Sequence, residues 1–398
     1  MFPEVATPAV LLDRPRLERN LSAAQARATG AAVQLRPHVK THRSVEIAQR
    51  QLAAGASGIT CAKPSEAQVF VDAGFEDVRV AYPVAGAHHL DRLIDLSRRA
   101  RISFCVDSIE SARLVSVAFC DAGLRAQVLT KIDCGYGRAG WRWDDAELAD
   151  AARALRDLQG LQVVGVLTHA GQAYQPGDAG VSTAETLMQH AIDERDRTEQ
   201  AATLVGDVLG SGPDSLEVSV GSTPTFWSFE PGSEMPGQRP AQRVTELRPG
   251  NYVFHDLTQV DLGACDLDHC ALSVLATVVS VRRRGGSPGR IHALIDAGKK
   301  TFTSDQRVAQ QGFGLVLDQQ SWEQTGRLAG RSDWRLHTLS EEHGWLDLPA
   351  DADLRVGDRV RVVMNHACVV ASTQAQLVET NGHQVVGMIE LSARGCSV

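Results

Sequence analysis

The amino-acid sequence predicts a (β/α)8 barrel joined to a smaller all-β domain. Between Val33 and about Phe254, eight short β-branched runs alternate with stretches whose apolar residues recur at helical spacing, as in an α/β barrel. After about Asp256, alternating apolar runs are separated by Gly, Pro and Asp, which is typical of antiparallel sheet. The 398 residues suffice for two hydrophobic cores. We therefore place the barrel at 14–256 and the all-β domain at 1–13 and 257–398.

The barrel strands are expected where β-branched residues cluster, at 33–39, 57–62, 78–83, 102–107, 127–133, 163–169, 216–221 and 250–254. Helices are expected between them, at stretches that include 44–54, 65–73, 145–158 and 183–209. A doubly wound open sheet is the alternative, but no GxGxxG follows the first strand. The all-β domain is expected to use strands at 271–282, 291–296, 359–364 and 384–391, whereas a strand at 9–13 fits either domain. A surface loop is expected at the Gly/Pro-rich stretch 229–240.

Composition narrows the class of protein. The formal net charge is -8 and no basic stripe occurs, which argues against nucleic-acid binding. No apolar run approaches the ~20 residues that cross a bilayer, and the N-terminus does not resemble a signal peptide. The eight cysteines form no CxxC pair, a pattern that suits reduced thiols in the cytoplasm.

Lysine is scarce in this chain, and one of its five lysines ends the first expected barrel strand. This residue is Lys40, in the segment RPHVKTH at 36–42. Active sites of such barrels lie at the C-terminal ends of the strands. Desolvation and nearby cations would lower the pKa of a lysine there, as a Schiff-base amine requires. The structural alternative is a lysine that caps a strand end at the surface.

Three later strand ends carry further polar side chains. The segment KIDCGYGRAG at 131–140 brings a Gly-rich turn and the cation of Arg138. The segment THAGQAY at 168–174 brings Tyr174 and His169, which can stack on a flat ring or exchange a proton. The segment VGSTPT at 220–225 offers hydroxyl groups and backbone N–H groups that suit a phosphate. Each is by itself compatible with an ordinary turn, but together they are the equipment of a pyridoxal 5'-phosphate (PLP) site.

A candidate metal site lies in Asn365-His366-Ala367-Cys368, within the expected all-β domain. If this segment is a strand, His366 and Cys368 face the same side and converge. An imidazole nitrogen and a thiolate suit zinc, and water and substrate would complete the coordination shell. Mn and Co also fit imidazole ligation. The structural alternative is a buried cysteine beside an incidental histidine.

On these segments the chain resembles the D-serine dehydratase and D-threonine aldolase group, which are PLP enzymes of the alanine racemase fold (fold-type III). The resemblance covers nearly the whole chain and follows many motifs in order. They are TPA at 7–9, LRPHVKT at 35–41, GASGIT at 55–60, THAG at 168–171, SVGSTPT at 219–225, RPGNYVF at 248–254, EHG at 342–344 and NHAC at 365–368.

The resemblance implies a role for each candidate residue. It implies that Lys40 binds PLP covalently, that Arg138 lies near the phenolic oxygen, and that His169 lies beside the ring. It also implies that Tyr174 contacts the cofactor and that Tyr252 faces the pyridine nitrogen. The phosphate would be bound by five residues. The phosphate residues are Gly221, Ser222, Thr223, Gly250 and Asn251. Lys40 and His169 are the expected catalytic residues, and a divalent metal on His366 and Cys368 would assist the leaving group.

The implied reaction is loss of water, and then ammonia, from a D-3-hydroxy amino acid such as D-serine or D-threo-3-hydroxyaspartate. The segment 220–225 and Cys368 resemble the dehydratase branch of the group. The segment ELSARG at 390–395 resembles the aldolase branch, so retro-aldol cleavage to glycine and an aldehyde is the alternative. A non-catalytic PLP carrier is a third possibility, against which the all-β domain and the NHAC segment argue. The fold also implies a homodimer.

Overall fold

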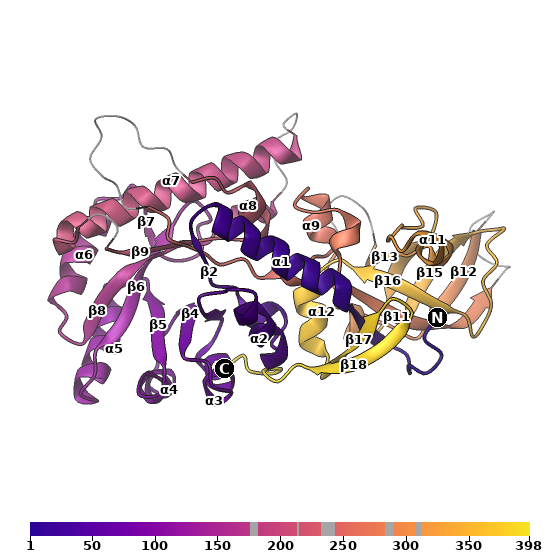
Figure 1. Cartoon of the computed structure of the whole chain (residues 1–398), viewed down its shortest axis with the longest axis horizontal. Coiled ribbons are helices and arrows are strands. Elements are labelled where there is room, and N and C mark those ends of the chain that lie inside the picture. Colours follow the sequence, from indigo (N-terminus) through magenta and orange to yellow (C-terminus); the bar gives the residue numbers. More distant parts are fainter. Residues whose placement is uncertain (176–181, 213–214, 232–242, 283–289, 307–311) are drawn as a thin grey trace. The chain divides into compact units, whose positions relative to one another are not determined.

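The computed structural model describes residues 1–175, 182–212, 215–231, 243–282, 290–306 and 312–398, which form two compact units (Figure 1). The barrel unit comprises 23–40, 47–250 and 395–398. The sheet unit comprises 1–22, 41–46 and 251–394. Residues 232–240 of the expected surface loop 229–240 lie outside the described residues.

Within the described residues, eight parallel strands of the barrel unit form a closed sheet. Their order is β2-β10-β9-β8-β6-β5-β4-β3, and a parallel bridge between His38 and Thr60 joins the two ends of this order. The short strand β7(Trp141–Arg142) adds to β6. The predicted (β/α)8 barrel is thereby confirmed. The barrel strands are β2(Gln34–Leu35), β3(Ile59–Cys61), β4(Asp77–Pro83), β5(Arg101–Val106), β6(Ala126–Asp133), β8(Leu161–Leu167), β9(Glu217–Val220) and β10(Glu246–Leu247).

Helices alternate with these strands, as the periodicity predicts. Each buries one apolar face; in α5, for example, Val115 and Phe119 are fully buried. The longest, α7, begins with a capping box between Ser182 and Glu185 and ends at Gly210, whose φ of 67° is left-handed. No helix among the described residues is long and apolar enough to cross a bilayer. The helices are α1(Arg14–Gly30), α2(Val45–Ala53), α3(Pro64–Asp72), α4(Ala87–Ser97), α5(Ile109–Asp121), α6(Glu147–Asp157), α7(Thr183–Leu209) and α8(Thr223–Ser228), with the 3-10 turns η1(Val39–Thr41) and η2(Gly171–Tyr174).

The prediction of a strand at 250–254 is wrong. The eighth strand is β10, and Asn251–Val253 form the 3-10 helix η3 instead. Pro249 has no N–H to extend a ladder, and the N–H groups of Phe254 and His255 both donate to the carbonyl of Asn251. The apolar run at 252–254 reflects burial, since Tyr252, Val253 and Phe254 are all almost fully buried. A buried helical turn and a buried strand have the same composition here.

The sheet unit contains a mostly antiparallel sheet in the order β14-β15-β12-β11-β1-β17-β18, with β16 paired to β11 and β13. Strand β1 pairs with β11 and β17, which assigns the segment 9–13 to this sheet. The strands expected at 271–282, 291–296, 359–364 and 384–391 are present as β11, β12, β16 and β18. The strands are β1(Ala9–Asp13), β11(Leu272–Arg282), β12(Arg290–Ile295), β13(Gly314–Val316), β14(Arg335–Leu339), β15(Gly344–Pro349), β16(Arg359–Met364), β17(Gln376–Asn381) and β18(Gln384–Glu390).

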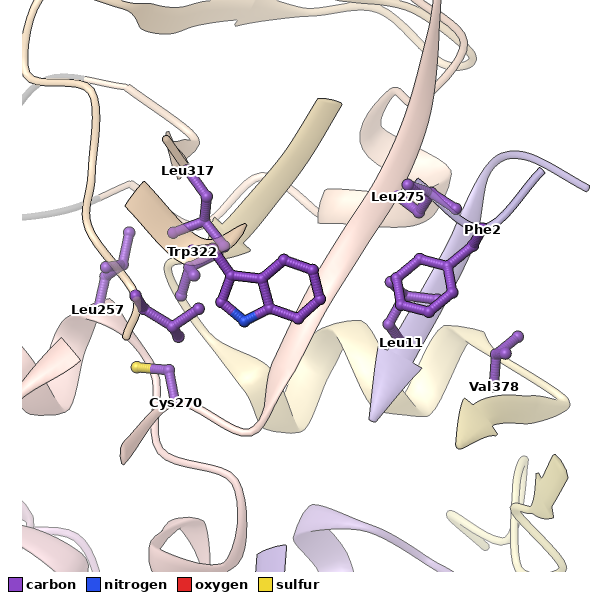
Figure 2. Close-up of a cluster of buried hydrophobic side chains, with 10 residues drawn as sticks. Phe2, Leu11, Leu257, Cys270, Leu275, Leu317, Trp322 and Val378 are labelled. Carbon is purple, nitrogen blue, oxygen red and sulfur yellow. The ribbon is translucent and has the colours of Figure 1, made fainter. Parts of the chain in front are cut away.

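The sheet also carries short helices that the sequence pattern does not reveal, because four to seven residues are too few to show a helical period. The core beneath them joins residues from distant segments, including Phe2, Leu11, Leu275, Trp322 and Val378 (Figure 2). The chain terminus, β1, β11, β17 and α11 therefore share one apolar cluster. The helices are α9(Leu257–Asp261), α10(Lys299–Phe302), α11(Gln319–Thr325) and α12(Ala367–Thr373), with the 3-10 turn η4(Leu267–His269).

Buried ion pairs cross the interior of the barrel. Glu246 of β10 is 2% exposed and accepts hydrogen bonds from Arg36 Nε, Arg79 Nη1 and Ser219 Oγ, each at 2.5 Å. Burial by itself would raise the pKa of Glu246, but Arg79 and Arg36 lower it to about 2. Because β4 and β10 are not neighbours in the sheet, the bond to Arg79 spans the barrel.

We expect Glu246→Ala to lower the free energy of unfolding by about 3–5 kcal/mol, because it removes the one carboxylate that two buried guanidinium groups share and leaves each with a single acidic partner, Asp77 or Glu217. Urea unfolding followed by circular dichroism measures this loss. The matched control is Asp150→Ala, which removes an exposed partner of Arg153 and should change stability by less than about 1 kcal/mol. Equal losses for the two variants would contradict the role of Glu246.

The same carboxylate predicts an acid-sensitive contribution to stability. The folded-state pKa of Glu246, about 2, lies below the ordinary glutamate value of 4.5, so its contribution is fully present above pH 4.5. The contribution is lost as the pH falls from 4.5 through about 2. The stability difference between the wild type and Glu246→Gln should therefore shrink over this window.

Candidate active site

Closure of the barrel brings the C-terminal ends of its parallel strands to one rim, where barrel enzymes place their active sites. Lys40 is exposed and follows β2 in the turn η1. The other predicted residues of this unit follow later strands. Arg138 lies between β6 and β7, His169 and Tyr174 follow β8, Gly221, Ser222 and Thr223 follow β9, and Gly250 follows β10.

The loop that carries Arg138 is shaped by a carboxylate. Asp133 accepts hydrogen bonds from the backbone N–H groups of Gly135, Tyr136 and Gly137 at 2.9–3.0 Å. The guanidinium of Arg138 then lies 5.2 Å from the centre of the Tyr136 ring. A Cβ atom at Gly171 would come within 2.3 Å of that ring, so this glycine permits the close approach. Tyr136, which the sequence analysis did not single out, therefore lies beside the predicted residues Arg138 and His169.

His169 stands among cations at this rim. Its Nδ1 lies 3.3 Å from the carbonyl oxygen of Gly221, and its ring contacts those of Tyr136 and Tyr174. Desolvation lowers the pKa of His169 well below its ordinary value, and the charges of Lys40, Lys131 and Arg138 lower it further. The imidazole is therefore neutral near pH 7, and the surrounding cations favour an anionic ligand.

Lys131 is a second lysine that the sequence analysis did not assign to the site. It is 5% exposed, and burial lowers its pKa to about 8, with Arg248 and Arg138 acting in the same direction and Cys105 opposing them. The available signal was a lysine within an otherwise apolar strand. Its proximity to His169 makes it the competitor of Lys40 for a covalent role.

Glu194 of α7 joins two of the loops that carry predicted site residues. Its Oε1 accepts hydrogen bonds from Ala170 N at 3.1 Å and Gly221 N at 2.9 Å, and its Oε2 accepts from Thr225 Oγ1 at 2.7 Å. Glu194 is only 2% exposed. This buried carboxylate fixes the position of His169 relative to the 221–225 segment.

The predicted phosphate segment is tightly built. Gly221 has a φ of 129°, and a Cβ there would lie 2.7 Å from Arg248 N, so no side chain fits. The Ser222 side chain caps α8 and lies 2.9 Å from Thr225 Oγ1. Because the N–H of Gly221 is donated to Glu194, the hydroxyl groups of Ser222 and Thr223 are the better candidates for contact with a phosphate.

The other predicted residues, Asn251, Tyr252, His366 and Cys368, belong to the sheet unit. The prediction that His366 and Cys368 lie on a strand is wrong, because β16 ends at Met364 and α12 begins at Ala367. A fully buried carboxylate causes this change of direction: Asp256 accepts from Ala367 N at 2.8 Å. It also accepts from Asn251 Nδ2 at 2.5 Å.

The two expected metal ligands nevertheless lie close enough to interact, because Cys368 is among the groups that act on the His366 ring. Burial alone would lower the pKa of His366, but Cys368, Asp256 and Asp305 raise it to about 10. The cause is the acidic and thiol side chains around this ring, which favour a cation at this place. The sulfur of Cys368 lies 3.3 Å from Thr41 Oγ1, and Thr41 follows Lys40 in the chain. The described residues contain no group of three or more His, Cys, Asp or Glu side chains that could hold a metal ion.

Comparison with known proteins gives matches over both units. The family model for the alanine racemase N-terminal domain matches residues 12–257, and that for a putative serine dehydratase domain matches 271–379. D-threo-3-hydroxyaspartate dehydratase of Delftia sp. is 36% identical over 379 residues, 92% of each chain. D-threonine aldolase of Arthrobacter sp. is 32% identical over 401 residues, 99% of this chain and 94% of that protein. A solved structure of the Delftia dehydratase is 35% identical and has a TM-score of 0.82 over 97% of each chain.

Glu194→Ala should weaken the binding of PLP about tenfold, because two buried N–H groups of the site loops lose their acceptor. Glu194→Gln keeps an oxygen for both N–H groups and should retain most of the affinity. Titration of the PLP-free protein with PLP, followed by visible absorbance, measures this affinity.

The control for this experiment is Glu199→Ala on the same helix, whose carboxylate accepts from Val244 N at 3.1 Å and so supports a segment that carries no predicted site residue. If Glu199→Ala weakens PLP binding as much as Glu194→Ala does, Glu194 has only a general structural role.

Proposed function

Since the chain belongs to the alanine racemase-like family of PLP-dependent enzymes, we propose that it is a lyase acting on a D-3-hydroxy amino acid. The substrate would be a compound such as D-serine or D-threo-3-hydroxyaspartate, which loses water and then ammonia to give a 2-oxo acid. The observation that carries this proposal is the pairing of His366 with Cys368 in a chain that is 36% identical to a dehydratase. This pair would supply a metal for a leaving hydroxyl group.

The residues at the rim of the barrel fit PLP by charge and by shape. Lys40 would bind the aldehyde carbon, Arg138 would face the phenolic oxygen, and His169 and Tyr174 would lie against the ring. The cations that surround His169 match a ligand that carries a phosphate and a phenolate. The phosphate would contact Ser222, Thr223 and the turn at Gly250 and Asn251, with Gly221 allowing the close approach, and Tyr252 would face the ring nitrogen.

His366 and Cys368 fit a divalent metal by the chemistry of their donor atoms. Imidazole and thiolate favour zinc, and Mn or Co would also accept the imidazole. When bound, PLP withdraws electrons from the substrate's α-carbon, and the metal polarises the β-hydroxyl group.

The chain's own groups would move the protons. The Lys40 amine, when it is not bound to the cofactor, would accept the proton from the substrate's α-carbon. The neutral His169 would lie beside the cofactor without adding a positive charge. The phenol of Tyr252 would be a weak partner for the ring nitrogen, so the metal held by His366 and Cys368 would supply part of the activation.

Retro-aldol cleavage is the second candidate function. The segment 390–395 resembles the aldolase branch, and D-threonine aldolase of Arthrobacter sp. is 32% identical over 99% of this chain. The same residues would then act on the bond between the α- and β-carbons. Cys368 favours dehydration, because the aldolase branch usually has an aspartate at this position.

Product analysis decides between the two reactions. Incubated with D-serine, the enzyme should release pyruvate and ammonia in equal amounts. Incubated with D-threonine, it should release 2-oxobutanoate and ammonia if this larger substrate is accepted. Glycine together with an aldehyde, in place of the 2-oxo acid, would establish the aldolase reaction instead.

Metal removal should abolish turnover while the visible absorbance of bound PLP persists. The physical reason is that Lys40 holds the cofactor covalently, whereas His366 and Cys368 hold only the metal. Exchange of the substrate's α-proton in deuterated water should continue in the metal-free enzyme, because it needs only Lys40 and PLP. Cys368→Ala should reproduce the metal-free behaviour. Full elimination activity in protein shown by elemental analysis to be metal-free would refute the assigned role.

The proposed enzyme is a cytoplasmic homodimer, with a barrel at 14–256 and a second domain at 1–13 and 257–398. Two-fold dimers are the commonest closed assemblies, and the fold family suggests one here. Light scattering at micromolar protein concentration should give twice the 42.8 kDa chain mass. A fully active species of single-chain mass would exclude the dimer.

A further inference from the structure

The imidazole of His366 is held by a carboxylate from a distant part of the chain. Nδ1 of His366 donates a hydrogen bond to Oδ2 of Asp305 at 2.6 Å, across 61 residues of sequence. A ligating histidine is neutral and carries one proton on its two nitrogens, so a proton fixed on Nδ1 leaves the lone pair on Nε2. The geometry therefore assigns Nε2 of His366 to any metal bound there.

We propose that Asp305 is a positioning residue that orients His366 for the metal, an inference that rests on the proposed function. A carboxylate on the far nitrogen of a ligating histidine fixes its tautomer and ring plane, and it makes the ligating nitrogen more basic. Such a residue needs no contact with the metal or substrate to control how tightly the metal binds.

The segment that carries Asp305 is fastened to the ligand segment by a second side chain. Asn365 is 3% exposed, and its Nδ2 donates to the carbonyl oxygens of Asp305 at 2.8 Å and of Gly312 at 2.9 Å. The carbonyl oxygen of Asn365 in turn accepts from Thr258 Oγ1 at 2.7 Å. Asn365 therefore holds the backbone of Asp305 beside His366. This second attachment distinguishes the contact between Asp305 and His366 from an incidental contact between two surface side chains.

We expect Asp305 to act on His366 mainly by orienting the imidazole ring, and less by electrostatic attraction. The side chains of His366 and Asp305 are 41% and 43% exposed, so water screens the charge between them. The observed contact of Asp305 is with the ring nitrogen of His366 through Oδ2, which is the contact of an outer partner of a ligand and not of a third ligand. The described residues also contain no ligand group of three or more His, Cys, Asp or Glu.

The test is zinc affinity of the PLP-loaded enzyme, measured by competition with a chromogenic chelator. We expect Asp305→Ala to weaken zinc binding by about 10–100-fold, as loss of an outer partner of a ligating histidine does elsewhere. Asp305→Asn keeps an oxygen acceptor for the Nδ1 proton and should lose less. Asp353→Asn is the charge-matched control, since its exposed partner is Arg355, and should bind zinc like the wild type. The visible absorbance of bound PLP reports that each variant is folded.

Cobalt distinguishes a positioning residue from a ligand. At saturating Co²⁺, the visible spectrum of Asp305→Ala should match that of the wild type, because His366 and Cys368 remain the protein ligands. A changed spectrum would make Asp305 a ligand and overturn the proposal, and so would wild-type zinc affinity in Asp305→Ala.

Two further variants separate this inference from the proposed function. His366→Ala and Cys368→Ala should each lose zinc binding. If they do while Asp305→Ala does not, only the role of Asp305 fails. If neither changes zinc binding, the metal assignment and the role of Asp305 fail together.

Discussion

The buried carboxylate of Glu246 is the interaction on which the barrel unit depends. It joins β10 to Arg36 beside β2, to Arg79 on β4 and to Ser219 on β9, so that one side chain ties strands from both ends of the strand order. Burying these charged groups carries a large desolvation cost. We therefore expect the network to act mainly by specifying which strands lie near each other, and less by adding to the free energy of unfolding. The placement of the strands decides where each strand ends, and hence which loops meet at the rim.

Other carboxylates position the loops of the proposed site by accepting hydrogen bonds, and none of them is proposed to react. Asp133 shapes the loop of Arg138, and Glu194 ties the loop after β8 to that after β9. In the sheet unit, Asp256 anchors the start of α12 and Asp305 holds the ring of His366. Each of these aspartates and glutamates satisfies donors that the irregular backbone or the imidazole would otherwise leave open.

The sequence predicts most of the barrel, because strand and helix periods are local properties. It also predicts the strand-end residues Lys40, Arg138 and His169 as one group, since parallel strands in a barrel end on the same side. It fails at 250–254, where apolar composition is the same for a buried turn and a strand, and at 365–368, where the chain leaves β16 and begins α12. At both places the deciding partner, Asn251 or Asp256, acts through backbone hydrogen bonds that composition does not reveal.

The missed residues share a different cause. Glu194 lies 27 residues from Gly221, and Asp305 lies 61 residues from His366. Neither belongs to a motif, and each resembles an ordinary acidic residue until the fold brings it to its partner. Lys131 was visible as a lysine in an apolar strand, but only the structure places its charge beside His169.

We propose that Lys40, and no other lysine, carries the cofactor. Two rivals are present: Lys131 is buried beside His169 with a pKa of about 8, and the Lys63 ammonium lies 3.6 Å from the centre of the Tyr82 ring. Borohydride reduction of the PLP-loaded enzyme fixes the cofactor to its lysine, and peptide mapping then identifies that residue. We expect a single modified peptide that contains Lys40. Modification of Lys131 or Lys63 with Lys40 unlabelled would show that another lysine carries the cofactor.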